Sequence, residues 1–126
     1  MQDDRCRVLI VEDDEQIATV LEDTLLEEGY EVRCVPNGSE GLALLARWSP
    51  DVIILDLMMP MLDGRSFRAA QRRLPPATAE IPVIVLSGAR DARAQAEAMA
   101  AAAAIAKPFE LDDILSTVGR VCQQLR

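Results

Sequence analysis

The sequence contains no histidine, and aromatic residues make up only 3% of its 126 positions. The absence of histidine, together with the absence of a CxxC pair, argues against a zinc site and against a catalytic cysteine–histidine pair. With so few aromatic rings, the hydrophobic core has to be built from aliphatic side chains. Half of the residues are hydrophobic, so the chain can still fold on its own and is not disordered.

Cysteine is also scarce, and the 21 acidic residues outnumber the 13 basic ones. The chain has an odd number of cysteines, and they lie far apart: Cys6, Cys34 and Cys122. This pattern predicts reduced thiols in a cytosolic protein. The net charge of −8 argues against nucleic acid or an anionic membrane as a direct partner. No hydrophobic run approaches the length of a membrane span, and the amino terminus, MQDDRCR, does not resemble a signal peptide. We therefore expect a cytoplasmic location.

What is present is a regular alternation of apolar runs and helical patterns. The length of 126 residues predicts one domain, 1–126. The segment 74–80, LPPATAE, is predicted to be a loop because its prolines disfavour a helix. Five strand–helix units in alternation predict right-handed crossovers, and therefore an α/β fold with a doubly wound parallel sheet and five helices. The expected strands are 7–11, 30–35, 52–55, 81–86 and 103–106, and the expected helices are 14–28, 39–48, 65–73, 91–101 and the segment from 111 onward.

The chain is organised around residues 51–64, DVIILDLMMPMLDG. The run 52–55 has bulky apolar residues with no alternation, which is typical of a strand covered on both faces. It ends abruptly at Asp56. Because open α/β sheets bind ligands at the carboxyl ends of their strands, we expect Asp56 to lie at the floor of a crevice and to be the reacting group.

Other chemically active residues follow the remaining strands. Glu12 and Asp13 follow the first strand, Ser87 follows the fourth and Lys107 follows the fifth. In a parallel sheet these ends share one edge, so the side chains should converge on Asp56. Crowded carboxylates repel one another unless a cation is present, and Mg²⁺ prefers oxygen ligands. The pattern therefore predicts a magnesium site that positions a phosphoryl donor against a carboxylate nucleophile.

Each of these residues also has a simpler interpretation. Asp13 or Asp14 could merely cap the first helix, and Ser87-Gly88 and Lys107-Pro108 are each common in turns. Their joint occurrence, in order on successive strands, favours the site.

Four segments together resemble the response-regulator receiver domains of bacterial two-component signalling: VLIVEDD, DLMMPMLDG, VIVLSG and AKPF. The resemblance covers essentially the whole chain and implies a flavodoxin-like fold with strand order 2-1-3-4-5. It implies that Asp56 is the phosphoacceptor and that Ser87 and Lys107 contact the phosphoryl group. The implied Mg²⁺ ligands are Glu12, Asp13, Asp56 and the backbone carbonyl of Met58.

The resemblance also implies partners. Receiver domains take a phosphoryl group from a phosphohistidine on a sensor histidine kinase or a histidine phosphotransfer protein, as in a phosphorelay. They catalyse that transfer themselves and slowly hydrolyse the product, so we expect a regulatory phosphoprotein rather than an enzyme. Output would pass to a downstream protein target or to an output domain, which we do not find in this sequence.

One position departs from the family. Three residues before the lysine, receiver domains usually carry Tyr or Phe, a ring that moves inward on phosphorylation, and here the residue is Ala104. The Gly-Ala pair that usually precedes the ring is replaced by Ala100-Ala101. We hypothesise that output uses the Ser87 loop or another face. Phosphorylation-linked NMR shifts in the helix 91–101 and the terminal helix that survive in Ser87→Ala would contradict this hypothesis.

Two alternatives remain open at this point. The first is a receiver-like interaction module regulated by partner binding instead of phosphate, which the absent ring makes conceivable although all five site residues are retained. The second is a small phosphatase resembling the haloacid dehalogenase type, which needs a second acid two residues after the nucleophile. That position is Met58.

Overall fold

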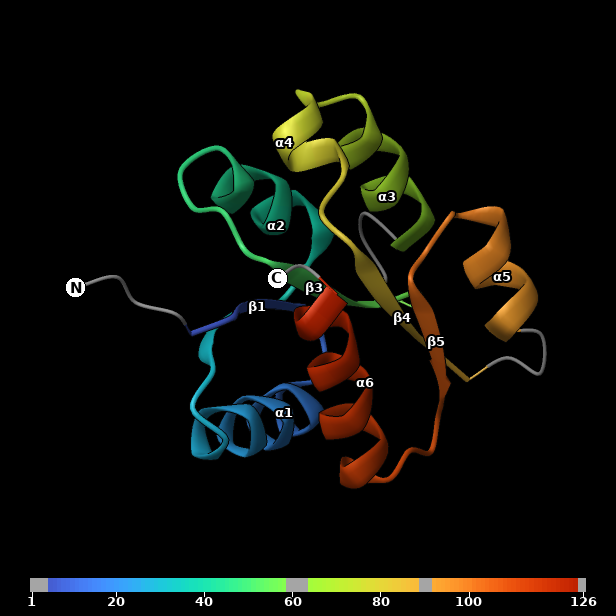
Figure 1. Ribbon diagram of the computed structural model, residues 1–126. Coiled ribbons are helices and arrows are strands. Elements are labelled where there is room, and N and C mark those ends of the chain that lie inside the picture. Colours follow the sequence, from blue (N-terminus) through green and yellow to red (C-terminus); the bar gives the residue numbers. More distant parts are fainter. Residues whose placement is uncertain (1–4, 59–63, 89–91, 125–126) are drawn as a thin grey trace.

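The computed structural model of the chain describes residues 5–58, 64–88 and 92–124. They form one parallel sheet with the order β2-β1-β3-β4-β5, covered by helices on both faces (Figure 1). This confirms the predicted doubly wound α/β fold and its strand order. The strands are β1 (Arg7–Val11), β2 (Glu31–Val35), β3 (Val52–Asp56), β4 (Val83–Ser87) and β5 (Ala103–Ala106).

Two helices cover one face of the sheet, and the remaining helices cover the other (Figure 1). On the first face α1 and α6 lie side by side, and on the second lie α2, α3, α5 and the short α4. Within the described ranges, no helix combines the length and the apolar character that a membrane span requires. The helices are α1 (Glu15–Glu27), α2 (Gly38–Leu45), α3 (Gly64–Arg72), α4 (Pro76–Ala79), α5 (Ala92–Ala98) and α6 (Leu111–Gln124).

The central strands are apolar without alternation because both of their faces are covered. All five residues of β3 and all five of β4 are buried. Alternate residues supply the two cores: Ile53 and Leu55 pack with α2, α3 and α5, whereas Val52 and Ile54 pack with α1 and α6. Since β3 lies between β1 and β4, its last residue, Asp56, is placed at the centre of the carboxyl edge.

The prediction of a loop at 74–80 and of five helices was wrong. Residues Pro76–Ala79 form the one-turn helix α4, so the described residues contain six helices. Proline disfavours a helix interior because it lacks an N–H group, but the first turn of a helix has no partner for that group. Pro76 is the first residue of α4, where its ring is compatible with the helix.

The alanine-rich segment after α5 changes from helix to strand within a few residues. Ala100 adopts a left-handed conformation with φ of 53°, and the N–H of Ala101 donates to the carbonyl of Ala96 at 2.9 Å. This hydrogen-bond pattern is the one with which helices commonly end, usually at a glycine. Helix propensity alone would have continued α5, so the termination needs additional support from outside the segment.

That support comes from α3. Arg68 is 7% exposed, and its guanidinium donates to the carbonyl oxygens of Met99 at 3.0 Å and Ala100 at 2.9 Å. Its Nη1 also donates to the side-chain oxygen of Gln71 at 2.8 Å. The Gln71 amide in turn donates to the carbonyls of Thr78 and Ile81 at 3.0 and 3.1 Å. This Arg68–Gln71 network joins α3, the segment before β4 and the end of α5.

The prediction of reduced thiols was wrong for two of the three cysteines. Cys6, which directly precedes β1, and Cys122, in the last turn of α6, form a disulfide with a Cα–Cα distance of 6.3 Å. A separation of 116 residues hides this pairing in the sequence, because only the fold brings the two segments together. Cys34 remains a free thiol. Burial, reinforced by the charge of Glu22, raises its pKa to about 12, which makes it a poor nucleophile.

Candidate functional site

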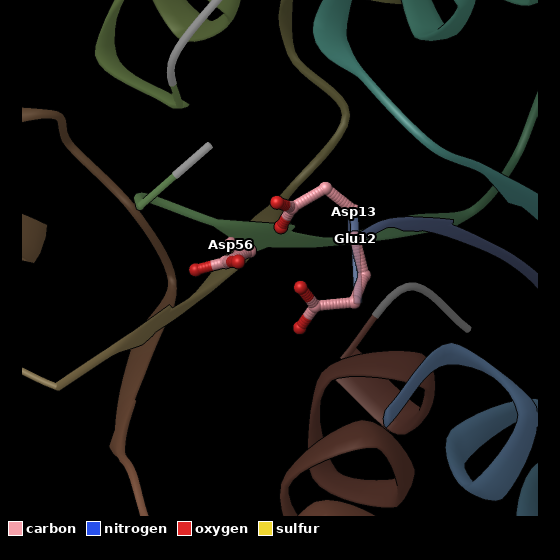
Figure 2. Close-up of side chains that lie close together, drawn as sticks. All are labelled: Glu12, Asp13 and Asp56. Carbon is pink, nitrogen blue, oxygen red and sulfur yellow. The ribbon is translucent and has the colours of Figure 1, made fainter. Parts of the chain in front are cut away.

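Three carboxylates gather at the carboxyl edge of the sheet (Figure 2). Glu12 and Asp13 follow β1 directly, and Asp56 ends the neighbouring strand β3, with Val11 and Leu55 paired in register. One oxygen from each carboxylate lies within 4.8 Å of the others. Glu12 and Asp56 are 2% and 1% exposed, whereas Asp13 is exposed. The predicted convergence of these three acids is therefore confirmed.

The structure separates the helix cap from the acidic cluster. Asp14 caps α1, because its Oδ1 accepts hydrogen bonds from the N–H groups of Gln16 at 2.9 Å and Ile17 at 3.2 Å. Asp13 does not have this role, so its carboxylate remains in the cluster. The backbone of Asp14 also donates to Glu12 Oε2 at 3.3 Å, which orients that buried carboxylate.

Lys107 reaches the cluster from the end of β5. Its Nζ lies 3.3 Å from Glu12 Oε1 and 3.3 Å from Asp56 Oδ2. Its backbone N–H donates to the carbonyl of Ser87 at 2.8 Å, which ties the end of β5 to the end of β4. The side chain is 23% exposed, so the ammonium stands at the boundary between solvent and the buried acids.

Ser87 is placed at the same edge. It is the last residue of β4 and is 1% exposed. Its neighbour Leu86 pairs in register with Asp56, and the Leu86 carbonyl accepts from the N–H of Leu57 at 3.0 Å. Ser87 thus lies one position beyond the residue that pairs with Asp56. The structure therefore brings four of the predicted strand ends to one edge.

The buried acids are electrostatically under-compensated. Burial, a hydrogen bond to Asp56 and the charge of Asp56 raise the pKa of Glu12 to about 8. Burial acts to lower the pKa of Lys107, but the neighbouring Glu12 and Asp56 outweigh it, so the net pKa is raised and the ammonium stays charged. Glu12 Oε1 accepts no hydrogen bond from the described residues, although Lys107 Nζ lies 3.3 Å away.

The backbone after β3 folds back onto the Asp56 carboxylate. The N–H of Met58 donates to Asp56 Oδ1 at 3.0 Å, while the Met58 side chain is 67% exposed. Residues 59–63 of the organising segment lie outside the described residues. At Gly64, a Cβ atom would lie 2.8 Å from both the Asp56 carbonyl oxygen and Leu57 Cα. Only glycine lets α3 begin this close to the end of β3.

The residues present fit a divalent cation. Magnesium prefers hard oxygen ligands and is typically held by one or two carboxylates together with water and a phosphate. The three carboxylates supply such ligands, and among the described residues a buried oxygen of Glu12 has no hydrogen-bond donor of its own. Two residues near the site have structural roles that the sequence did not assign. Asp14, and not Asp13, caps α1. Gly64 allows close packing of α3 on β3, and the only sign of this in the sequence was a glycine where a helix follows a strand end.

Comparison with known proteins identifies the family. Residues 8–119 match the response regulator receiver domain. The transcriptional regulatory protein PcoR of Escherichia coli is 32% identical over 122 residues, which cover 95% of this chain and 53% of that protein. The DNA-binding dual master transcriptional regulator RpaA of Synechocystis is 35% identical over 115 residues, covering 89% of this chain and 47% of that protein. The chain thus spans about half the length of the curated relatives it matches.

Solved structures agree with this assignment. The chemotaxis protein CheY4 of Vibrio cholerae has a TM-score of 0.84 at 31% identity, over 93% of this chain and 98% of that one. The receiver domain of the Francisella response regulator 1452 has a TM-score of 0.88 at 27% identity, over 97% of this chain and 100% of that one. The chain therefore belongs to the response regulator receiver domain family, and its role is regulatory rather than that of a classical enzyme.

Proposed function

We propose that this domain is a magnesium-dependent phosphoryl-accepting switch with Asp56 as the acceptor. The observation that carries the proposal is the meeting of Glu12, Asp13 and Asp56 within 4.8 Å, with the Lys107 ammonium 3.3 Å from two of the carboxylates. A structural role would not require three acids and one lysine at the ligand-binding edge of a parallel sheet.

The proposed metal ligands are the carboxylates of Glu12, Asp13 and Asp56 and the backbone carbonyl of Met58. When bound, Mg²⁺ neutralises charge that develops on the transferring phosphoryl group. The N–H of Met58 donates a hydrogen bond to Asp56, which keeps the backbone of Met58 beside the proposed acceptor. We propose Lys107 and Ser87 as the residues that contact the phosphoryl oxygens, the first as a point charge and the second as a hydroxyl donor.

In the proposed reaction, an oxygen of Asp56 attacks the phosphorus of a phosphohistidine. The P–O bond to Asp56 forms as the P–N bond breaks, and the leaving imidazole takes up a proton. Attack by water on the same phosphorus later releases inorganic phosphate and restores the carboxylate. Phosphorylation replaces a compact carboxylate with a larger dianionic group beside Lys107, which changes the local charge and thereby the binding of partners.

The proposed donor is a sensor histidine kinase or a histidine phosphotransfer protein, and residues 1–126 act as one receiver domain in the cytoplasm. Receiver domains act together with histidine kinases and output domains, and several relatives are transcriptional regulators. We propose that this domain does not itself contact nucleic acid or membrane, because its net charge is −8. Its output would go to a separate protein target or to an output domain outside residues 1–126.

Intact-mass spectrometry after incubation with acetyl phosphate tests the proposal. We expect one phosphoryl adduct that requires Mg²⁺ and disappears in Asp56→Asn, because Asp56 is the proposed acceptor. Asp23→Asn, an exposed acid on α1, is the matched control and should keep the adduct. If the folded protein forms no adduct with Mg²⁺ present, the proposal is wrong and a phosphate-independent interaction module is favoured.

A further inference from the structure

A hollow of about 310 Å³ lies beside the disulfide, at the opposite end of β1 from the acidic cluster. Both bonded cysteines, Cys6 and Cys122, line it, together with residues 28–30 after α1 and Gly119 of α6. Cys6 precedes the first residue of β1, whereas the acids follow its last residue, so the two places are separate. The two cysteines are 5% and 6% exposed, and the hollow therefore gives a reagent its route to the sulfur–sulfur bond.

Two glycines keep the hollow open. Gly29 has φ of 91°, and no described atom lies within 4 Å of the position that a Cβ would occupy there. Gly119 lies inside α6, and among the described residues a Cβ there would contact Tyr30 Oη, at an ordinary distance of 3.7 Å. Packing therefore does not require glycine at 119, although glycine is unfavourable in a helix interior. What this glycine does is leave the space beside the disulfide unfilled.

Apolar packing already holds α6 on the sheet without the disulfide. Ile114 and Val118 are fully buried and Val121 is 3% exposed, and all three belong to the core formed with β1 and β3. The fold is therefore expected to survive loss of the covalent bond. In a reducing cytosol, permanent structural disulfides are rare, and those that form are usually transient and redox-sensing.

We propose that Cys6–Cys122 is a redox-active disulfide, cleaved through this hollow by a thiol reductant of the cell and restored by peroxide. The proposal rests on the cytoplasmic location proposed above, but not on the phosphoryl chemistry of Asp56. The attacking thiolate has to be external to the chain. Burial raises the pKa of Cys34, the third cysteine, to about 12, so this thiol stays protonated at neutral pH.

The electrostatic surroundings favour attack at Cys122. Cys6 is the better leaving group because Arg5, the residue before it, also lines the hollow, and a nearby cation favours a thiolate. Cys122 lies in the last turn of α6, where the helix dipole disfavours negative charge. The reductant sulfur thus bonds to Cys122 Sγ as the bond to Cys6 Sγ breaks.

A second thiolate of the reductant completes the reduction. It attacks the reductant sulfur of the mixed disulfide, so that Cys122 leaves and the reductant becomes a disulfide. Two electrons pass to the cysteine pair, and two protons complete its thiols. In the reverse direction, peroxide oxidises one thiolate to a sulfenic acid, and attack by the other thiolate restores the bond, with two waters formed in total. Reduction frees the last turn of α6 from the start of β1.

Mass spectrometry of the folded, whole protein tests the proposal. Protein oxidised with stoichiometric peroxide is incubated with glutathione at the cytosolic ratio of thiol to disulfide, or with thioredoxin, a protein dithiol. It is then quenched in acid, unfolded and labelled with N-ethylmaleimide. The oxidised protein should take up one label, at Cys34, and the reduced protein three. Reduction by glutathione would identify a small thiol as sufficient, and reduction by thioredoxin alone would identify a protein dithiol.

Matched variants test the route through the hollow. Gly119→Leu, which fills the hollow, should slow reduction at least tenfold, whereas Ser116→Leu, at an exposed position of α6 outside the hollow, should not. If Gly119→Leu does not fold, Gln123→Trp should slow reduction at least tenfold, with Gln124→Trp as its control. Asp56→Asn should be reduced at the same rate as the unsubstituted protein, so failure of the redox chemistry and failure of the phosphoryl chemistry are separate results.

Hydrogen exchange tests the release of α6. The backbone amides of residues 121–124 should exchange at least tenfold faster in the reduced protein than in the oxidised protein, because the covalent link to β1 is lost. The amides of β3, far from the hollow along the sheet, should be the unaffected control.

Four outcomes would overturn the proposal. They are one label after incubation with either reductant, three labels after peroxide, equal rates of reduction in the hollow-filling variants and their controls, and unchanged exchange of residues 121–124. The first would make the disulfide a permanent structural bond. The third would mean that reduction follows unfolding of the domain instead of access through the hollow.

Discussion

In the described part of this chain, charged side chains are buried in two clusters, one around Arg68 and one around Glu12. The two clusters differ in how completely the buried charged group is hydrogen-bonded. The Arg68 guanidinium donates to two carbonyls at the end of α5 and to Gln71, at distances from 2.8 to 3.0 Å. Around Glu12, by contrast, one buried carboxylate oxygen accepts no hydrogen bond from any residue that the structure describes, and a second buried acid, Asp56, lies next to it. Arg68 and Glu12 are both buried, so the difference is not one of exposure.

The difference separates a structural cluster from a functional one. A fully hydrogen-bonded buried network fixes the elements that it joins, and removing a member leaves unpaired groups in the core. An under-compensated cluster costs stability in the isolated protein and recovers that free energy when a ligand of opposite charge binds. The Arg68–Gln71 network therefore holds the scaffold, and the cluster of Glu12, Asp13 and Asp56 is poised for a cation.

The largest effect on stability is expected at Arg68. Arg68→Met keeps much of the side-chain volume but removes every donor to Met99 and Ala100, so the free energy of unfolding should fall by about 3 kcal/mol. Urea denaturation measures this change. Arg72→Met, an exposed arginine of the same helix, should change the free energy of unfolding by less than about 0.5 kcal/mol. Equal effects of the two substitutions would contradict a structural role for the network.

The acidic cluster should behave in the opposite way and gain stability from a ligand. At a Mg²⁺ concentration about 100-fold above Kd, the free energy of unfolding should rise by about 2.7 kcal/mol. Asp13→Asn should remove most of this gain because it deletes an exposed ligand without disturbing the core. Urea titrations with and without MgCl₂ measure the gain in the free energy of unfolding for the unsubstituted protein and for Asp13→Asn. A gain that is unchanged in Asp13→Asn would exclude Asp13 as a ligand.

The pH dependence without metal sharpens the comparison. The pKa of Glu12 in the folded protein, about 8, exceeds its ordinary value of 4.5, so the folded state retains a proton that the unfolded state loses. The contribution of Glu12 to stability should therefore be fully present below pH 4.5 and be lost as the pH rises through about 8. Urea denaturation in EDTA at several pH values should show a loss of a few kcal/mol, since one pKa unit corresponds to about 1.4 kcal/mol. Glu12→Gln should abolish this loss, and an identical pH profile in the variant would show that another group is responsible.

The smallest effect on stability is expected at Ala100, whose left-handed backbone conformation is held by hydrogen bonds from Arg68. Ala100 has φ of 53°, which glycine adopts more readily than alanine, so Ala100→Gly should stabilise the fold by about 0.5–1 kcal/mol. Ala94→Gly, at an exposed position inside α5, should instead destabilise it by a similar amount. Thermal unfolding distinguishes the two signs. Destabilisation by Ala100→Gly would mean that the left-handed residue carries no strain.

Much of the fold and most of the site geometry followed from local patterns. Unbroken apolar runs indicated covered strands, and because each run ended in a chemically active residue, the shared edge of a parallel sheet brought those residues together. The features that escaped prediction depend on contacts between distant segments. Nothing near Ala98 indicates that α5 ends there, since the guanidinium that donates to the carbonyls of Met99 and Ala100 belongs to Arg68 on α3. Likewise, Cys6 and Cys122 carry no local sign of pairing.

That disulfide has a mechanical consequence. Cys6 precedes the first strand and Cys122 lies in the last turn of the last helix, so the covalent link encloses the entire sheet. A pulling force applied to the segments before Cys6 and after Cys122 would pass through the sulfur–sulfur bond and bypass β1 to β5. While the bond is intact, tension on the two ends cannot peel the strands apart, and the edge that carries Asp56 remains unloaded. Reduction would place the same force directly on β1 and α6.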